Sequence, residues 1–199
     1  MPKRKNAELR KTEILEHFYK VIIEQGIEGA SIIKIAKSMN IHPSLISHYF
    51  KTKGAMLIEF ADFIKVKYDP PFIRNQFVTI TDPQQRYDAF FDTMFSEANI
   101  KSINDSVYYA IYYLSYRNPE IKSRFSDMFK KHRDFIMQEL RFFKKVGLVK
   151  KEIDLTLAAN FIVSVFEGLS FQNVFFSNGD GFKVFEKFAV KIIKDFLES

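Results

Sequence analysis

The chain has 199 residues and a formal net charge of +6, and 47% of its residues are hydrophobic. This length suffices for one or two compact domains with a buried core, and the hydrophobic share excludes a disordered chain. The absence of cysteine excludes disulfides, thiolate metal sites and cysteine nucleophiles, and it suits a reducing cytosol.

The positive charge is concentrated in the N-terminal quarter. Residues 1–53 hold ten Lys and Arg against five Asp and Glu, whereas the rest of the chain holds twenty against nineteen. A net charge of +5 in one short stretch points to a polyanion as the partner of that stretch. A solvated basic tail is the alternative.

Apolar residues recur at helical spacing in the N-terminal part, which predicts four helices after a disordered basic arm at residues 1–7. Gly26 is placed to end the first helix, and Ser31 is placed to cap the second. Pro43 suits the first position of the third helix, after a turn at residues 38–41 in which Asn40 tolerates the left-handed conformation. The expected ranges are about 8–25, 31–38, 43–50 and 52–68.

The remaining sequence predicts five further helices and no strand, so we expect an all-α fold of about nine helices. Their expected ranges are about 82–102, 105–117, 119–147, 155–176 and 181–197. The helix over 105–117, DSVYYAIYYLSYR, is apolar or aromatic on nearly every side, and such a helix is usually buried all round. The 23 Phe residues hint at an aromatic-lined cavity or interface.

One segment carries a recognisable pattern. Residues 26–57, GIEGASIIKIAKSMNIHPSLISHYFKTKGAML, resemble the DNA-binding segment of the TetR family of bacterial transcriptional regulators. The later chain resembles the family in helix count and length, and in the step Glu167-Gly168-Leu169. The matching features of the segment, at gapless spacing, are Gly26, Ser31, Ile35-Ala36, the turn before Ile41, and Tyr49-Phe50-Lys51-Thr52-Lys53.

The resemblance implies a homodimer that binds a pseudopalindromic operator in double-stranded DNA. It implies a three-helix helix-turn-helix DNA-binding domain, with the basic arm, at residues 1–53. A linker helix would join it to a helical ligand-binding and dimerisation domain at residues 54–199. A small-molecule effector in that domain would change the separation of the two DNA-binding domains of the dimer. The wide apolar faces of the last two helices suit a four-helix bundle between two protomers.

The second helix of a helix-turn-helix enters the major groove, and only its exposed side touches base edges. Ile46 and Phe50 are four residues apart and should pack inward. The candidates for the outward side are Pro43, Ser44, Leu45, Ser47, His48 and Tyr49. The candidates for phosphate contact are Ser31, Lys34, Tyr49 and Lys53. For each of them an ordinary solvated side chain is the alternative. The outward side lacks Arg, Asn and Gln for bidentate base contacts, so DNA shape and phosphate positioning should carry much of the specificity.

The effector site is expected among aromatic residues. Five tyrosines share one face of the 105–117 helix, which suggests a cavity with several hydroxyls: Tyr108, Tyr109, Tyr112, Tyr113 and Tyr116. Residues of neighbouring helices would complete it: Phe91, Met94, Phe95, Phe166 and Glu167. Such a lining suits a flat lipophilic or cationic molecule. The alternatives are core or dimer packing for the tyrosines, and an ion pair across a dimer for Glu167.

The sequence therefore favours a ligand-responsive transcriptional regulator, and first a repressor released by a small hydrophobic or cationic effector. A transcriptional activator, and a helical small-molecule carrier without specific DNA binding, are the alternatives. Because HExxH, Walker, GxGxxG and GxSxG motifs are absent, we expect no enzyme, no metal and no cofactor. The sequence shows no signal peptide, and its longest apolar segments, such as 161–171, are broken by Glu167 and are expected to be too short to span a bilayer. We therefore expect a cytoplasmic protein without a membrane partner.

Overall fold

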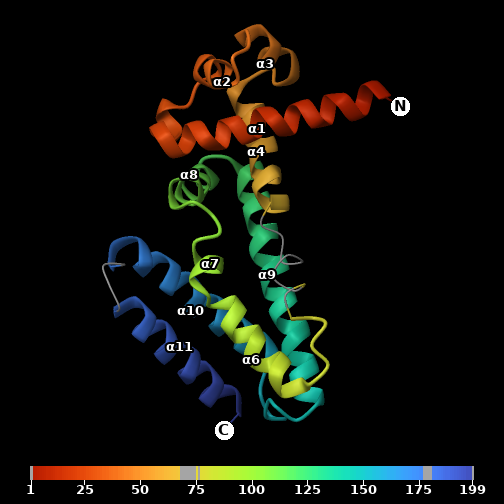
Figure 1. Cartoon of the computed structure of the whole chain (residues 1–199), viewed down its shortest axis with the longest axis vertical. Helices are drawn as coiled ribbons and strands as arrows, with labels where there is room; N and C mark the ends of the chain where they lie inside the picture. Colours follow the sequence, from red (N-terminus) through yellow and green to blue (C-terminus); the bar gives the residue numbers. More distant parts are fainter. Residues whose placement is uncertain (1, 68–74, 76, 177–180, 199) are drawn as a thin grey trace. The chain divides into compact units, whose positions relative to one another are not determined.

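The structure is a computed structural model that describes residues 2–67, 75, 77–176 and 181–198. Every regular element in these ranges is an α-helix, which confirms the all-α prediction (Figure 1). The helices are α1 (Pro2–Gly29), α2 (Ile32–Met39), α3 (Pro43–Tyr49), α4 (Lys53–Lys67), α6 (Pro83–Met94), α7 (Glu97–Ile100), α8 (Asp105–Ser115), α9 (Pro119–Lys145), α10 (Leu155–Phe176) and α11 (Gly181–Glu198).

The chain divides into two compact units, and neither is continuous in sequence. The first unit comprises residues 1–68 and 103–128, and the second comprises residues 69–102 and 129–199. The first unit therefore holds α1 to α4 together with α8 and the first turns of α9. The second unit holds α6, α7, the rest of α9, α10 and α11.

The first unit is built around α1, which contacts α2, α3, α4 and α8 (Figure 1). Phe18 of α1 and Phe60 of α4 are both buried, and their ring centroids lie 4.8 Å apart. Val107 and Ile111 of α8 are buried in the same unit. The short helices α2 and α3 thus share a core with longer helices, which supply the packing that short helices need.

The first helix is longer than the sequence predicted. It begins at Pro2 and includes residues 2–7, which were expected to form a disordered arm, so that prediction is wrong. Between Pro2 and Gly26 the chain has strong helix formers and no breaker, which explains the extension. Gly26, the predicted helix end, has a φ of 69° and kinks α1 before its last turn ends at Gly29.

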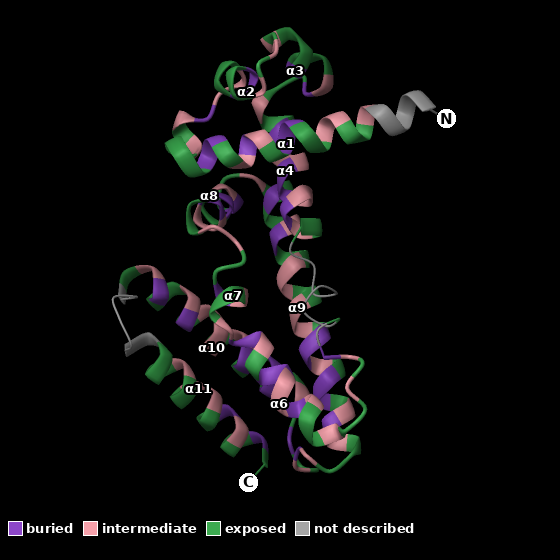
Figure 2. Cartoon of the chain, in the orientation of Figure 1, coloured by how far each residue is buried: buried purple, intermediate pink, exposed green. Residues whose placement is uncertain are grey.

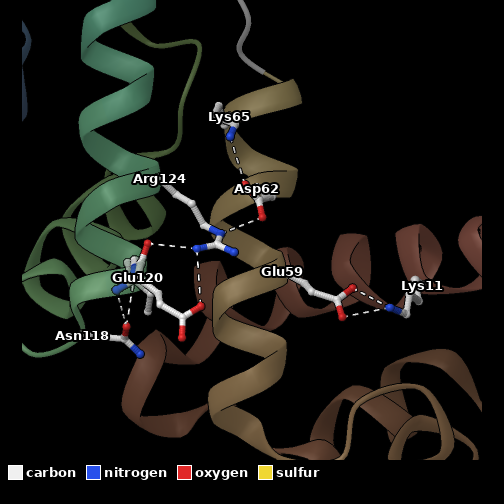
Figure 3. A network of polar contacts seen from close by, with 8 residues as sticks. Lys11, Glu59, Asp62, Lys65, Asn118, Glu120 and Arg124 are labelled. Atoms are coloured by element: carbon white, nitrogen blue, oxygen red, sulfur yellow. Dashed lines mark hydrogen bonds and ion pairs between the residues drawn. The ribbon is translucent and has the colours of Figure 1, made fainter.

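A polar network links α4 to the start of α9 inside the first unit (Figure 3). Arg124 Nε donates to the Asp62 carboxylate at 2.7 Å, and Lys65 Nζ lies 3.1 Å from the same carboxylate. Burial acts to raise the pKa of Asp62, but hydrogen bonds from Arg124 and Lys65 outweigh it, so the pKa lies below its usual value. The ion pair of Lys11 with Glu59, at 2.9 Å, joins α1 to α4.

The core of the second unit is rich in phenylalanine. Phe90 contacts Phe91 and Phe143 with ring centroids 4.9 and 5.7 Å apart, and all three rings are fully buried. The other buried rings of this core are Phe77, Tyr87, Phe95 and Phe135. Much of the aromatic excess in the sequence therefore fills a core, with the edge-to-face geometry that aromatic rings prefer.

The single helix expected over residues 82–102 is two helices, α6 and α7. The chain leaves α6 after Met94, and Ser96 caps α7 by accepting a hydrogen bond from Asn99 N at 3.2 Å. The Asn99 side chain in turn donates to Met94 O at 2.7 Å, which satisfies a carbonyl at the end of α6. Serine and asparagine compete in this way with the backbone bonds of a continuous helix.

Much of α11 is exposed, as its green segments show (Figure 2), and both of the last two helices expose apolar residues. Large exposed apolar residues of this surface are Leu157, Phe161, Phe171, Phe175, Val184, Phe185, Phe188, Ile192 and Phe196. Among the described residues, one stretch, Leu155–Phe175, is long and apolar enough to cross a membrane by length and composition, and 22% of the tested window is buried. A soluble protein seldom leaves so large an apolar surface uncovered.

A buried ion pair joins α6 to α9 in the second unit. The Glu139 side chain is 1% exposed, and Arg86 donates to its carboxylate through two nitrogens, at 3.1 and 2.7 Å. The Arg86 guanidinium also lies over the ring of Phe142, 4.5 Å from its centroid. A buried carboxylate of this kind depends on its partner, because water cannot replace the lost bonds.

We predict that Arg86→Met lowers the free energy of unfolding by about 3–5 kcal/mol, because it leaves the Glu139 carboxylate buried without its cation. The matched control is Lys101→Met, which breaks an ion pair of 2.7 Å between two half-exposed side chains and should change the free energy of unfolding far less. Urea denaturation of both variants measures the difference. Equal losses in the two variants would contradict the burial argument.

Candidate DNA-binding and effector sites

The turn between α2 and α3 has the geometry of a helix C-cap. Asn40 adopts the left-handed conformation, with a φ of 53°. Its N–H donates to Lys37 O at 3.1 Å, and the N–H of Ile41 donates to Ala36 O at 3.0 Å. These two bonds end α2 and redirect the chain towards α3, as in a Schellman motif. The sequence predicted both the turn and the role of Asn40.

His42 caps α3, which the sequence did not reveal. Its Nδ1 accepts a hydrogen bond from Ser44 N at 3.3 Å and lies 2.7 Å from Ser44 Oγ. Pro43 follows at the first helical position, as predicted. The Ser44 hydroxyl, which was expected to face DNA freely, is therefore also part of the cap. Histidine is not among the preferred capping residues, so the pattern gave no signal.

The two faces of α3 are separated as the helical spacing predicted. Ile46 and Phe50 are buried, and Ile35 of α2 is buried in the same unit. The exposed residues of α3 are Ser44, Leu45, Ser47 and His48, and the half-buried ones are Pro43 and Tyr49. One side of α3 thus holds it to the first unit while the other side is open to solvent.

The residues expected to contact phosphates differ in the contacts that they already make within the chain. Ser31 caps α2 by accepting a hydrogen bond from Lys34 N at 3.3 Å, and Lys34 is exposed. Tyr49 packs edge-on against His48, with ring centroids 5.2 Å apart. Lys53, at the start of α4, donates through Nζ to Ile27 O at 3.2 Å and so ties α4 to the end of α1.

The residues expected to line an effector site fall in different units. The five tyrosines belong to α8 and its end in the first unit, whereas the phenylalanines, Met94 and Glu167 belong to the second. Tyr112, Tyr113 and Tyr116 are 45%, 43% and 74% exposed, so the prediction of a helix buried all round is wrong. The side of α8 that is buried carries small and aliphatic residues instead: Val107, Ala110, Ile111 and Ser115.

The tyrosines make contacts within the first unit. Tyr108 lies edge-on to Tyr109 at 5.4 Å and to Phe125 of α9 at 5.5 Å, measured between ring centroids. The hydroxyls of Tyr112 and Tyr116 lie 2.8 Å apart. The predicted stripe therefore exists, and part of it packs on α9.

The predicted residues of the second unit range from core to half-buried. Phe91, Met94 and Phe95 are fully buried. Phe166 of α10 is half-buried and lies edge-on to Phe95, with ring centroids 6.1 Å apart. Glu167 is half-buried beside it in the chain. Phe95 and Phe166, which were both expected to line the effector site, are thus in contact.

The structure adds His132 of α9 to this group. Its ring lies edge-on to Phe166, with centroids 5.4 Å apart. Burial lowers the pKa of His132 to about 4, so the imidazole is neutral at pH 7. Its Nε2 atom and Ser170 Oγ are buried and have no hydrogen-bond partner among the described residues. His132 lies on the apolar stripe that continues with Phe135 and Ile136, and this placement was the available signal.

The fold and the geometry of α2 and α3 define a helix-turn-helix protein with a helical second part. Residues 14–60 match the family described as "Bacterial regulatory proteins, tetR family". Residues 82–194, more than half of the chain, match "Tetracyclin repressor-like, C-terminal domain". The chain belongs to the TetR family, and the resemblance inferred from residues 26–57 is confirmed.

Two relatives illustrate the range of sequence similarity. The HTH-type transcriptional regulator PksA of Bacillus subtilis (strain 168) is 40% identical over 57 residues, which are 29% of this chain and 28% of PksA. The HTH-type transcriptional regulator BetI of Yersinia pestis (strain Pestoides F) is 24% identical over 123 residues, 61% of this chain and 62% of BetI. Each match spans less than two thirds of the relative's length.

Solved structures share the fold over almost the whole chain. A transcriptional regulator from Saccharomonospora viridis, in complex with choline, has a TM-score of 0.80 at 19% identity and covers 96% of this chain and 98% of its own. A TetR transcription regulator from Haloarcula marismortui ATCC 43049 has a TM-score of 0.78 at 17% identity, covering 94% and 98%. At such identities the likeness shows the fold alone.

The lowered pKa of His132 predicts acid destabilisation. The unfolded chain binds a proton near pH 6.5, whereas the folded chain binds it only near pH 4. Stability is therefore lost as the pH falls from about 6.5 to about 4, by about 3 kcal/mol, and is not lost further below that range. Urea denaturation across this range should show that His132→Phe removes this part of the pH dependence. Parallel curves for the variant and the wild type would contradict it.

Proposed function

We propose that this chain is a DNA-binding transcriptional repressor that leaves its operator when a small hydrophobic or cationic effector binds. The observation that carries the proposal is the open side of α3, on a helix whose opposite side is buried. That side lies in the part of the chain with a net charge of +5. Family membership supports the regulatory role.

The DNA contacts we propose follow from the exposed side of α3. Leu45 and Pro43 suit thymine methyl groups, and Ser47 and His48 suit polar base edges or phosphates. Lys34 and Tyr49 would contact phosphates and so position the helix-turn-helix on the DNA. We assign residues 1–53 to DNA binding and residues 54–199 to ligand binding and dimerisation. The first unit extends past residue 53, so the DNA-binding segment depends on later helices for its stability.

The effector site we propose lies in the second unit, where Phe95 and Phe166 are in contact and Glu167 is adjacent. Aromatic rings and a carboxylate suit an apolar or cationic molecule. The choline complex of the Saccharomonospora viridis protein, which shares the fold, supports a cationic effector as one candidate. Coupling of about 1–3 kcal/mol between effector and operator would change operator affinity roughly 5- to 150-fold. The tyrosines of α8 remain a second candidate lining.

A second copy of the chain is the proposed partner of α10 and α11. The exposed residues Phe185, Phe188, Ile192 and Phe196 of α11 recur at helical spacing and form one stripe. Two such faces related by a two-fold axis bury each other in a four-helix bundle. The same symmetry matches the two half-sites of an operator. We favour a second copy of the chain over a membrane as the partner of α10 for two reasons. Both α10 and α11 expose apolar residues, and the chain belongs to the TetR family.

We further propose a cytoplasmic protein without enzymatic activity. The reducing compartment suits a chain without cysteine. Two alternatives remain as outcomes of the tests below. An activator would bind the operator specifically but raise reporter expression, and a carrier would bind DNA only without sequence preference.

The DNA-binding proposal predicts that some substitutions lower the overall affinity for DNA and that others change the sequence preference. Lys34→Ala should weaken binding to operator and unrelated DNA alike and reduce the salt slope by about one, because it removes one phosphate contact. Leu45→Ala and Ser47→Ala should instead change the preference among base pairs, by less than the roughly 1–3 kcal/mol that a bidentate contact supplies. Fluorescence anisotropy with DNA from upstream of the chain's own coding sequence, at two salt concentrations, measures both effects.

The control for this experiment is Lys151→Ala, an exposed lysine in the connector between α9 and α10. It removes the same charge far along the chain and should leave affinity and salt slope unchanged. Binding that depends on salt but not on sequence in the wild type would overturn the regulator proposal in favour of the carrier. A reporter gene behind the bound DNA then separates repression from activation.

The dimer proposal predicts that Phe188→Glu yields a monomer at micromolar concentration, because it places a charge in the centre of the apolar stripe. Its matched control is Val66→Glu on α4, where an even more exposed apolar residue lies outside this surface. Light scattering coupled to size-exclusion chromatography measures the mass. A wild-type monomer, or a dimer that survives Phe188→Glu, would contradict the assignment of this surface.

A further inference from the structure

Three buried polar side-chain atoms of the second unit lack hydrogen-bond partners among the described residues: the Tyr87 hydroxyl, Nε2 of His132 and Oγ of Ser170. The last two belong to residues that lie next to Phe166. Leaving a buried donor or acceptor unsatisfied destabilises a protein, so folded proteins pair nearly all such groups. The His132 and Ser170 atoms are therefore able to form a hydrogen bond with a bound molecule.

The His132 nitrogen and the Ser170 hydroxyl belong to residues that both lie next to Phe166. The His132 ring lies edge-on to Phe166 at an interplanar angle of 80°, with ring centroids 5.4 Å apart. Ser170 follows Phe166 by one turn of α10, so both project from the same side of that helix. Phe166 in turn contacts Phe95 at 6.1 Å between ring centroids. His132 of α9 thus contacts Phe166 directly, and Ser170 lies one turn further along the same side of α10.

The unpartnered side chains of His132 and Ser170 are uncharged at pH 7, although the Glu167 carboxylate follows Phe166 in the chain. Because burial lowers the pKa of His132 to about 4, its imidazole is neutral at pH 7 and carries one donor and one acceptor nitrogen. The buried carboxylate of Glu139 on the same helix is already paired with Arg86. A neutral imidazole and a serine hydroxyl bind a hydroxyl or carbonyl group, which can donate or accept as they require.

We propose that His132 Nε2 and Ser170 Oγ hold the neutral hydrogen-bonding group of the effector, while its apolar body lies against Phe166 and Phe95. The ligand class is an aromatic or aliphatic alcohol, or a molecule that carries such a hydroxyl. The inference rests on the proposed function in that it assigns this group to the effector.

A purely structural role would give a different pattern. A histidine kept for packing or stability has a partner for its buried nitrogen, and replacing it by an apolar ring would lower stability. Here the replacement removes an unsatisfied group and keeps the edge-on contact with Phe166. Stability of the ligand-free protein and ligand affinity should therefore respond in opposite directions, which separates a binding residue from a structural one.

Binding of phenol and benzene to the full-length protein tests the proposal, because the two probes differ only in the hydroxyl. Saturation is followed by NMR of the histidine ring signals, with the His132 signals assigned from their loss in His132→Phe. We expect phenol to bind roughly 3- to 10-fold more tightly than benzene and to shift the His132 signals. Absence of saturable phenol binding, or equal affinity for the two probes, overturns the proposal.

The variants sharpen this test. His132→Phe and Ser170→Ala should each reduce or abolish the preference for phenol over benzene. The matched control is Ser164→Ala, because Ser164 is an exposed serine of α10 whose hydroxyl donates to Asn160 O at 2.9 Å. It should retain the full preference. Loss of the preference in the control as well, or its retention in His132→Phe, overturns the proposal.

The ligand-free variants provide a readout that does not depend on any probe. His132→Phe should melt at the same temperature as the wild type or higher at pH 7, and a clear decrease would overturn the proposal. Operator binding in the anisotropy assay distinguishes the two levels of inference. If the protein prefers phenol to benzene but does not bind DNA specifically, the proposed function is wrong and the proposed site stands. If it binds DNA specifically but does not prefer phenol, the proposed site is wrong and the proposed function stands.

Discussion

The packing of α1 against four other helices is the constraint on which the first unit depends. The reading helices α2 and α3 are too short to be stable alone, and they persist because Ile35, Ile46 and Phe50 are buried. The same α1 also contacts α4 and α8, and the bond from Arg124 to Asp62 fastens α4 to the start of α9. The DNA-reading helices and the tyrosine helix are therefore parts of one folded unit.

The helix α9 gives this unit a continuous connection to the second one. Its residues up to Met128 belong to the first unit, and those from Phe129 belong to the second. Arg124 and His132 lie about two turns apart on this helix. An effector that contacts His132 would thus act on the helix whose other end holds α4 through Asp62. A regulator whose effector alters DNA binding needs a physical connection between the two proposed sites, and α9 runs through both units.

The sequence predicted the features that local rules determine. Helical spacing located the buried side of α3, and Asn40 and Pro43 marked the turn between the reading helices. Features that depend on tertiary contacts were missed or wrong. The exposure of Tyr112 and Tyr116 depends on which side of α8 meets α1, and the unpartnered nitrogen of His132 depends on what surrounds it. Periodicity finds a helix face but not its neighbours.

Hydrogen exchange measured by mass spectrometry on Arg124→Gln tests the central claim, that Arg124 fastens α4 to the start of α9 within the first unit. Removing the charge leaves Asp62 without its bond from α9. The account predicts faster exchange in α4 as well as in the first turns of α9, with α6 and α10 unchanged. Faster exchange confined to α9, with α4 as protected as in the wild type, would contradict it.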